Sequence, residues 1–160
     1  MQSYSTELII KAPRSKVFSA LTTEEGLRSW WTNTCKVDST VGKKSRFEFV
    51  FDDGITYNVM LNEIVNPNEK LVWKCIEQYH PTKPDGKKFK NPNEWVDSRI
   101  IFILSEESGN TKLNFTHEGL TPKLECYDVC NDGWNHFLHD SLKPYLEEGL
   151  GNPYEYNRKS

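Results

Sequence analysis

The sequence lacks the features that would place this protein on nucleic acid or in a membrane. Its 20 Lys and Arg are outnumbered by 23 Asp and Glu, which gives a formal net charge of −3 and a pI near 5.8. Neutralising phosphates requires a basic surface, so we predict no nucleic-acid partner. No run of residues approaches the ~20 apolar positions of a membrane helix, and the first residues have neither a basic start nor an apolar stretch. We therefore expect a soluble, cytoplasmic protein.

Catalytic and metal-binding motifs are missing as well. The sequence has no Gly-rich phosphate loop, no G-x-S-x-G motif and no pair of carboxylates in a catalytic pattern. Its 4 cysteines come without a secretory signal, so free thiols are expected. His136, His139 and Asp140 would face solvent on a helix, with no further metal ligand fixed by spacing. We predict no metal, no cofactor and no catalytic residue, and a binding protein rather than an enzyme.

Aromatic residues are abundant. The 5 Trp, 7 Tyr and 8 Phe make up 12% of the 160 residues, within an apolar content of 36%. Charged residues account for 27%, so the composition excludes a disordered, collagen-like or low-complexity chain. A chain of this length can bury one core without disulfides or metals. We expect one domain over residues 1–160, with its core in 3–153 and a short C-terminal tail at 154–160.

The two ends of the chain predict helices. Residues 3–11 alternate as a first strand, after which Pro13 suits the first position of a short helix. Thr22 and Glu25 form a capping-box pattern for a second short helix. Near the C-terminus, one amphipathic helix is expected over residues 121–149, wide enough to cover one face of a sheet.

The middle of the chain alternates between apolar and polar residues, as strands do. The expected strands are 46–51, 55–62, 71–75, 96–104 and 111–117. An Asp52-Asp53-Gly54 turn joins the first two, and a long loop at residues 80–94 precedes the fourth. Without alternating helices, these strands make an antiparallel meander. Together with the closing helix they predict an α+β helix-grip fold, in which a curved sheet wraps around the C-terminal helix.

Three segments, in order, resemble a known family. They are Ala12–Thr22 followed by Leu27 and Trp30-Trp31; Thr111–Gly119; and Gly133-Trp134 followed by Leu142-x-x-Tyr145-Leu146-Glu147-x-Gly149. They resemble the activator of heat-shock-protein-90 ATPase homologue family, part of the START-like, Bet v1-like (SRPBCC) superfamily. The resemblance covers nearly the whole chain and implies the same helix-grip fold. The superfamily includes ligand binders, transporters, cyclases and chaperone activators, so the fold leaves the activity open.

Positions expected to face inward on the strands and the closing helix are rich in aromatic residues. Such rows either fill an ordinary core or line a pocket for a small molecule. On the pocket interpretation, the ligand-binding residues are Trp31, Phe49, Tyr57, Trp73, Phe102, Phe115, His117, Tyr127, Cys130 and Trp134. We predict a domain that binds a small apolar or amphipathic ligand in a cavity between sheet and C-terminal helix.

Two alternatives remain open. The family resemblance suggests a chaperone-associated protein-interaction module, although the eukaryotic activator resembles this chain only in its C-terminal domain. A small pocket enzyme would instead use His117 or Tyr127 as an acid or base. Glu63 and Glu77 extend the expected inward rows of their strands and would add polar groups to such a pocket.

Overall fold

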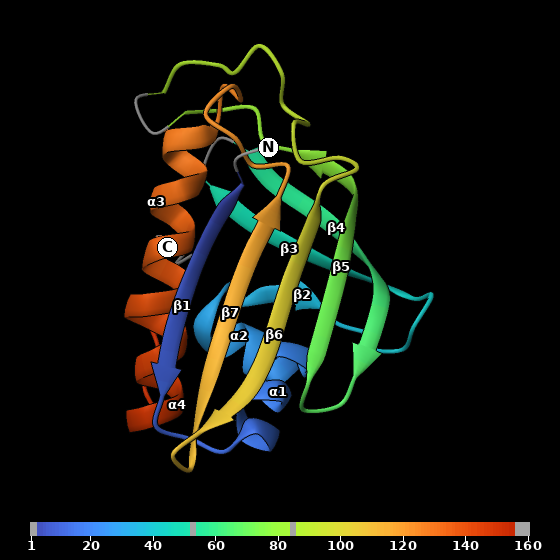
Figure 1. Ribbon diagram of the computed structural model, residues 1–160. Coiled ribbons are helices and arrows are strands. Elements are labelled where there is room, and N and C mark those ends of the chain that lie inside the picture. The colour runs from blue at the N-terminus through green and yellow to red at the C-terminus, as the bar shows by residue number, and fades with distance from the viewer. Residues whose placement is uncertain (1–2, 52–53, 84–85, 156–160) are drawn as a thin grey trace.

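A computed structural model describes residues 3–51, 54–83 and 86–155 (Figure 1). Its strands are β1 (Tyr4–Ile10), β2 (Thr34–Lys36), β3 (Lys44–Phe51), β4 (Gly54–Asn66), β5 (Lys70–Tyr79), β6 (Arg99–Glu107) and β7 (Asn110–Glu118). Its helices are α1 (Arg14–Thr22), α2 (Glu24–Trp30), α3 (Tyr127–Phe137), the π-helical turn η1 (Leu138–Leu142) and α4 (Lys143–Glu148). The expected turn residues Asp52 and Asp53, and most of the expected C-terminal tail, lie outside the described residues.

The strands form one antiparallel sheet in the order β1-β7-β6-β5-β4-β3-β2. The three-residue strand β2 pairs with β3 at the sheet edge and was not foreseen, because three residues are too few to show an alternating pattern. Two register shifts interrupt the pairing of β4 with β5, and such bulges bend a sheet. The curved sheet and the C-terminal helices confirm the α+β helix-grip fold.

The C-terminal helical run begins later than the sequence predicts. Helix α3 starts at Tyr127 rather than Thr121, and residues 121–126 form turns instead. The start of α3 is held from the loop after β5, where the Glu94 carboxylate accepts hydrogen bonds from the N–H groups of Glu125 at 3.0 Å and Cys126 at 2.9 Å. A carboxylate at this position also matches the positive end of the helix dipole. This long-range contact outweighs the local signal of Thr121 and its proline.

The second short helix is capped one residue later than expected. The Thr23 hydroxyl, not that of Thr22, accepts the hydrogen bond from the Gly26 N–H at 3.0 Å. The Thr22 hydroxyl instead donates back to the Phe18 carbonyl within α1 at 2.8 Å. The two helices lie almost end to end, and the boundary falls where Thr23 takes extended backbone angles.

All five tryptophans belong to one continuous array in the core. Trp31 stacks on Trp30, Trp73 and Trp134, with ring centroids 6.0, 5.9 and 5.3 Å apart. Trp95 stacks on the far side of Trp134 at 5.7 Å. Each of these side chains is at most 8% exposed. The array joins the inner face of the sheet, helix α2 and helix α3 into one core.

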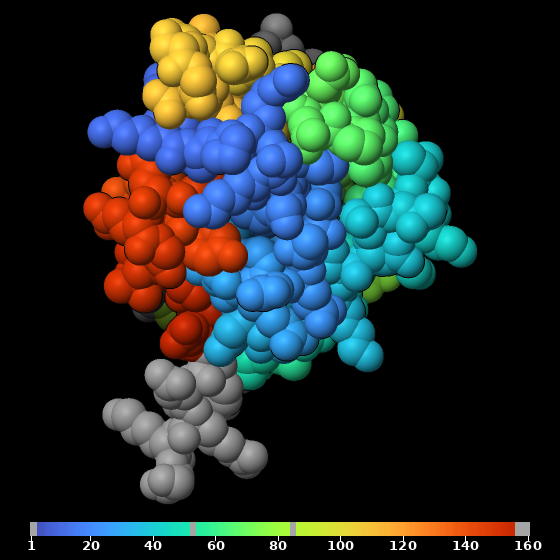
Figure 2. Space-filling model, turned by 90° about the horizontal axis from the view of Figure 1, so that it is seen from below, coloured from blue at the N-terminus to red at the C-terminus, as the bar shows by residue number. Residues whose placement is uncertain are grey.

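Helices α1 and α2 close one end of the space between sheet and C-terminal helices. Helix α1 contacts β6, β7 and α4, while α2 contacts η1. Figure 2 shows this end from below, with α1 and α2 lying between the C-terminal helical run and the turn that joins β4 to β5. Any route into the interior must therefore start from another side. Within the described ranges, no helix is both long and apolar enough to cross a membrane.

Candidate functional site

A cavity of about 330 Å³ lies between the inner face of β3–β5, helix α3 and the loop that follows β5. Its aromatic lining comes from Trp31, Phe49, Phe51, Trp95, Trp134, Phe137 and Tyr154. Its polar side chains are Thr56, Asn58, Gln78 and His80. Apolar walls with a few polar groups are typical of small-molecule sites, and this volume lies at the lower end of their usual range of about 300–1,000 Å³.

Four of the residues singled out from the sequence line this cavity: Trp31, Phe49, Cys130 and Trp134. Three others, Trp73, Phe102 and Phe115, lie behind them in the core and are at most 2% exposed. They pack edge to face, with centroids 5.0 Å apart between Trp73 and Phe102. These three therefore support the cavity wall rather than form it, and ligand binding by the four lining residues stays a prediction.

Tyr57 faces the outer side of the sheet, so the expectation that it faces inward is wrong. The Arg46 guanidinium lies over its ring at 3.8 Å, and Tyr57 is the register partner of Glu48. The inward positions at this end of β4 are held by Thr56 and Asn58, which line the cavity, and Asn58 is only 3% exposed. The hydrophobic pattern was misleading because the more apolar set of alternating residues in β4 faces outward, where Arg46 covers the Tyr57 ring.

The polar ends of the expected inward rows also lie on the outer face. Glu63 pairs with Arg99 at 2.7 Å, and Glu77 lies 3.9 Å from Arg46. In β5 the cause is the register shift opposite Val59, which places one extra residue in the strand and reverses the alternation beyond Cys75. Gln78 consequently faces inward and lines the cavity.

His117 lies in the core with both ring nitrogens occupied. The Trp134 indole N–H donates to Nδ1 at 3.0 Å, so the ring proton is on Nε2, which lies 2.8 Å from the Ser98 hydroxyl. Complete burial lowers the pKa of His117 from 6.5 to about 3. Tyr127 begins α3 and is not among the cavity-lining residues. The structure does not bring His117 and Tyr127 together as an acid and base in the cavity.

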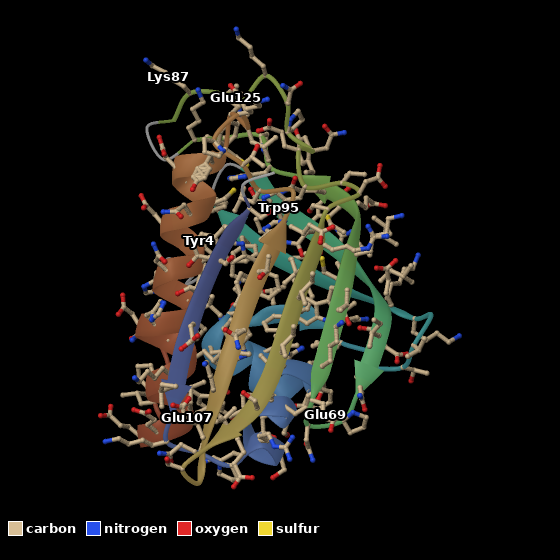
Figure 3. All side chains as sticks on the ribbon, viewed as in Figure 1. Tyr4, Glu69, Lys87, Trp95, Glu107 and Glu125 are labelled. Atoms are coloured by element: carbon tan, nitrogen blue, oxygen red, sulfur yellow. The ribbon has the colours of Figure 1, made fainter. Side chains whose placement is uncertain are left out.

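Trp95 is the main lining residue that sequence reasoning missed, because it lies in the loop before β6 rather than in a strand. Its backbone N–H donates to Gln78 Oε1 at 2.8 Å, which draws this loop onto β5. Its indole N–H donates to Cys130 Sγ at 3.3 Å. Figure 3 shows Trp95 at the end of the sheet below the loop that carries Lys87. An aromatic residue directly after the polar loop residues Asn93 and Glu94 was the available signal.

Cys130 presents its sulfur at the cavity wall. A hydrogen bond with the Cys126 side chain lowers the pKa of Cys130, desolvation acts against it, and His80 and Trp95 lower it further. The same hydrogen bond, together with burial, raises the pKa of Cys126. Cys130 is thus the more acidic thiol of the pair. All the cysteines are free and buried, as expected.

A second hollow, of about 480 Å³, opens next to the cavity. The two share Phe51, Thr56, His80 and Val129, and the outer one is also lined by Lys83 and Lys88. Lys83 pairs with Glu125 at 3.5 Å, and Lys88 donates to the Thr82 hydroxyl at 3.2 Å. The outer hollow is a polar approach to the apolar cavity, formed by the loop after β5.

In the described part of the chain, no three His, Cys, Asp or Glu side chains are grouped so that they could hold a metal ion. The two histidines that the sequence places on the C-terminal helix make other polar contacts. His139 Nε2 lies 2.8 Å from the Thr6 hydroxyl, and His136 Nε2 lies 3.2 Å from the Asn152 carbonyl.

Comparison with known proteins gives one family and many solved structures. The family model described as Activator of Hsp90 ATPase homolog 1-like protein matches residues 11–147. The Aha1 dimer from Colwellia psychrerythraea, solved in solution, is 29% identical with a TM-score of 0.73, covering 94% of this chain and 100% of that one. No curated protein matches the sequence.

Two more distant crystal structures share the fold. Protein MLL2253 from Mesorhizobium loti is 21% identical with a TM-score of 0.63, covering 86% of this chain and 92% of that one. Protein SSP2350 from Staphylococcus saprophyticus is 18% identical with a TM-score of 0.69, covering 94% and 96%. These likenesses concern the architecture alone.

Proposed function

The chain belongs to the family of Activator of Hsp90 ATPase homolog 1-like proteins, and from this premise we propose that it binds a small apolar or amphipathic molecule between its sheet and helix α3. The binding domain would be the whole START-like chain. Four free thiols suit a reducing compartment, so we place this binding in the cytoplasm.

The observation that carries the proposal is the lining of the cavity. Stacked indole rings and a few buried amides enclose about 330 Å³ beside a polar approach. An apolar molecule that enters removes its own surface and that of the rings from water, which is worth about 25 cal/mol per Å². The polar approach would suit the more hydrophilic end of an amphipathic ligand.

The test uses a substitution that fills the cavity from its wall. Gly133 lies on the cavity side of α3, and a Cβ atom added there meets nothing within 4 Å. Gly133→Phe should therefore occupy the ligand's space while α3 gains a better helix-forming residue. Native mass spectra of the freshly purified wild type are expected to contain an extra mass that vanishes on denaturation. The same mass should be absent from Gly133→Phe.

The matched control places an apolar side chain on the solvent side of the same helix. Asp132→Leu changes an exposed neighbour of Gly133 and should leave the bound mass in place. An adduct that survives in Gly133→Phe would mean that the molecule binds elsewhere. A wild type that carries no adduct and binds no member of an apolar ligand panel would contradict the proposal.

Family membership supports a second candidate, a chaperone-associated interaction module. The matching family model is described by Hsp90 ATPase activation, and the solved structure from Colwellia psychrerythraea is described as an Aha1 dimer. On this function the purified protein stimulates the ATPase of an Hsp90 chaperone and co-purifies with it. Unchanged ATPase rates at high micromolar concentrations of this protein would refute the candidate without affecting the ligand proposal.

A further inference from the structure

One buried oxygen in the cavity wall has no hydrogen-bond partner. Asn58 is 3% exposed and lines the cavity, and its Oδ1 is the one buried side-chain nitrogen or oxygen without a partner among the described residues. Burial removes the water that would otherwise bind this carbonyl, and an unpaired buried acceptor is unfavourable. Retaining such a group is expected where a bound molecule supplies the missing donor.

A second buried asparagine on the same strand shows what a structural role looks like. Asn62 is 2% exposed, and its Nδ2 donates to the Thr40 carbonyl at 3.0 Å and to the Asp38 carbonyl. These bonds tie β4 to the segment before β3. Asn62 thus stabilises the fold, whereas Asn58 lines the cavity and its buried Oδ1 has no partner among the described residues.

Gln78 places a second amide beside Asn58. The two residues are register partners on β4 and β5, and both line the cavity. Gln78 Oε1 accepts from the Trp95 N–H at 2.8 Å, and Gln78 Nε2 has no acceptor among the described residues but is not itself fully buried. An acceptor and a donor therefore lie next to each other, which is the arrangement that a hydroxyl group satisfies from both sides.

The cavity also discriminates by charge. No Asp, Glu, Lys or Arg belongs to its lining as described, so a charged group inside would lose water without meeting a permanently charged side chain. The partly exposed rings of Phe49, Phe51 and Phe137 offer apolar surface to an aromatic molecule.

We infer that the ligand is an uncharged aromatic molecule that carries a hydroxyl group, and this inference rests on the proposed function. The hydroxyl donates to Asn58 Oδ1, which a turn of the Asn58 amide brings to the cavity side, and accepts from Gln78 Nε2. The ring system lies against the partly exposed phenyl rings of the cavity lining. A ligand whose polar atoms are acceptors only, such as an aryl ether, leaves Asn58 unsatisfied and binds more weakly.

Calorimetric titration with naphthol and its methyl ether tests this directly, because the two probes share one ring system and differ in the donor. Naphthol should bind the wild type about tenfold more tightly, the factor expected for one hydrogen bond to a buried acceptor. In Asn58→Leu this preference should fall to about twofold or less. Leu has the branched shape of Asn with larger terminal groups, for which the adjacent cavity leaves room, and it needs no hydrogen bond, so this variant should unfold at an equal or higher denaturant concentration.

The control is the next residue along the strand. Tyr57→Leu alters the outer face of the sheet and should keep the tenfold preference. Equal affinities of the two probes for the wild type, or a preference that persists in Asn58→Leu, would overturn the inference. A crystal structure of the naphthol complex in which only a water molecule satisfies Asn58 would do the same.

Failure of the proposed function gives a different result. In that case neither probe binds the wild type, or both bind Gly133→Phe as well as they bind the wild type. Because the comparison of the two probes is made on wild-type protein, it does not depend on how well Asn58→Leu folds.

Discussion

Acid should destabilise this protein through His117. The folded state holds the imidazole neutral, because burial lowers its pKa to about 3 and because Trp134 already donates to its Nδ1 at 3.0 Å. A second ring proton would have to displace that indole N–H. In the unfolded chain the same imidazole takes up a proton near its ordinary pKa of about 6.5.

The magnitude follows from the difference between these two pKa values. Between pH 6.5 and pH 3 the unfolded state binds a proton that the folded state refuses, so stability falls as the pH falls. The contribution of His117 is intact above pH 6.5 and decreases by about 1.4 kcal/mol per pH unit below it. At pH 4.5 the loss amounts to about 3 kcal/mol, a large part of the usual stability of a domain.

Urea unfolding of the wild type and of His117→Gln at pH 7.5 and pH 4.5 measures this term. The glutamine keeps an N–H near Ser98 but leaves the Trp134 indole without its acceptor, so the variant should be about 1–3 kcal/mol less stable at pH 7.5. At pH 4.5 the gap should shrink by about 3 kcal/mol, because the variant lacks the titrating ring. All other titrating groups are common to both proteins and cancel in the difference.

Two results would refute this reasoning. One is a gap between the two proteins that stays constant from pH 7.5 to pH 4.5. The other is a ring resonance of His117 in the folded protein that titrates near pH 6.5 in NMR spectra, since a buried, hydrogen-bonded imidazole should remain neutral there.

Other substitutions test the core, the buried amides and a helix cap. Phe102→Ala should lower the free energy of unfolding by about 3–5 kcal/mol in denaturant titrations, because the ring is fully buried; a loss below about 1 kcal/mol would contradict its place in the core. Asn62→Leu should lower it by about 1–3 kcal/mol while Asn58→Leu leaves it equal or higher, and equal losses in both would show that Asn58 is also bonded. Thr23→Ala should lower it by about 0.5–2 kcal/mol and more than Thr22→Ala, and the reverse order would restore the cap to Thr22.

Much of the fold was predictable because its signals are local. Alternation within each strand, and the Asp-Gly turn, predict the antiparallel order without reference to distant residues. The apolar stripe that contains Cys130 and Trp134 likewise predicts a helix that faces the sheet, and both residues line the cavity. The start of α3 escaped prediction because Glu94, more than thirty residues away, supplies its cap.

The cavity was only partly predictable, since its polar side depends on strand register. Alternation predicts that every second residue of a strand faces inward, and a bulge reverses this alternation beyond it. Nothing in the residues around Cys75 indicates the bulge that turns Gln78 inward. In β4 the apolar row that includes Tyr57 suggests the core side, yet Asn58 takes that side. A hydrophobic pattern identifies where a core packs, and it is least informative where a wall has to hold polar groups.

The tryptophan array gives the protein an intrinsic spectroscopic probe. Neighbouring indoles in the array lie 5.3 to 6.0 Å apart, from Trp30 through Trp31 and Trp134 to Trp95, with Trp73 branching from Trp31. At such separations excitation passes between the rings, so the emission and near-ultraviolet circular dichroism belong to the array and not to single residues. A molecule in contact with Trp95 would therefore change the signal of tryptophans that it never touches.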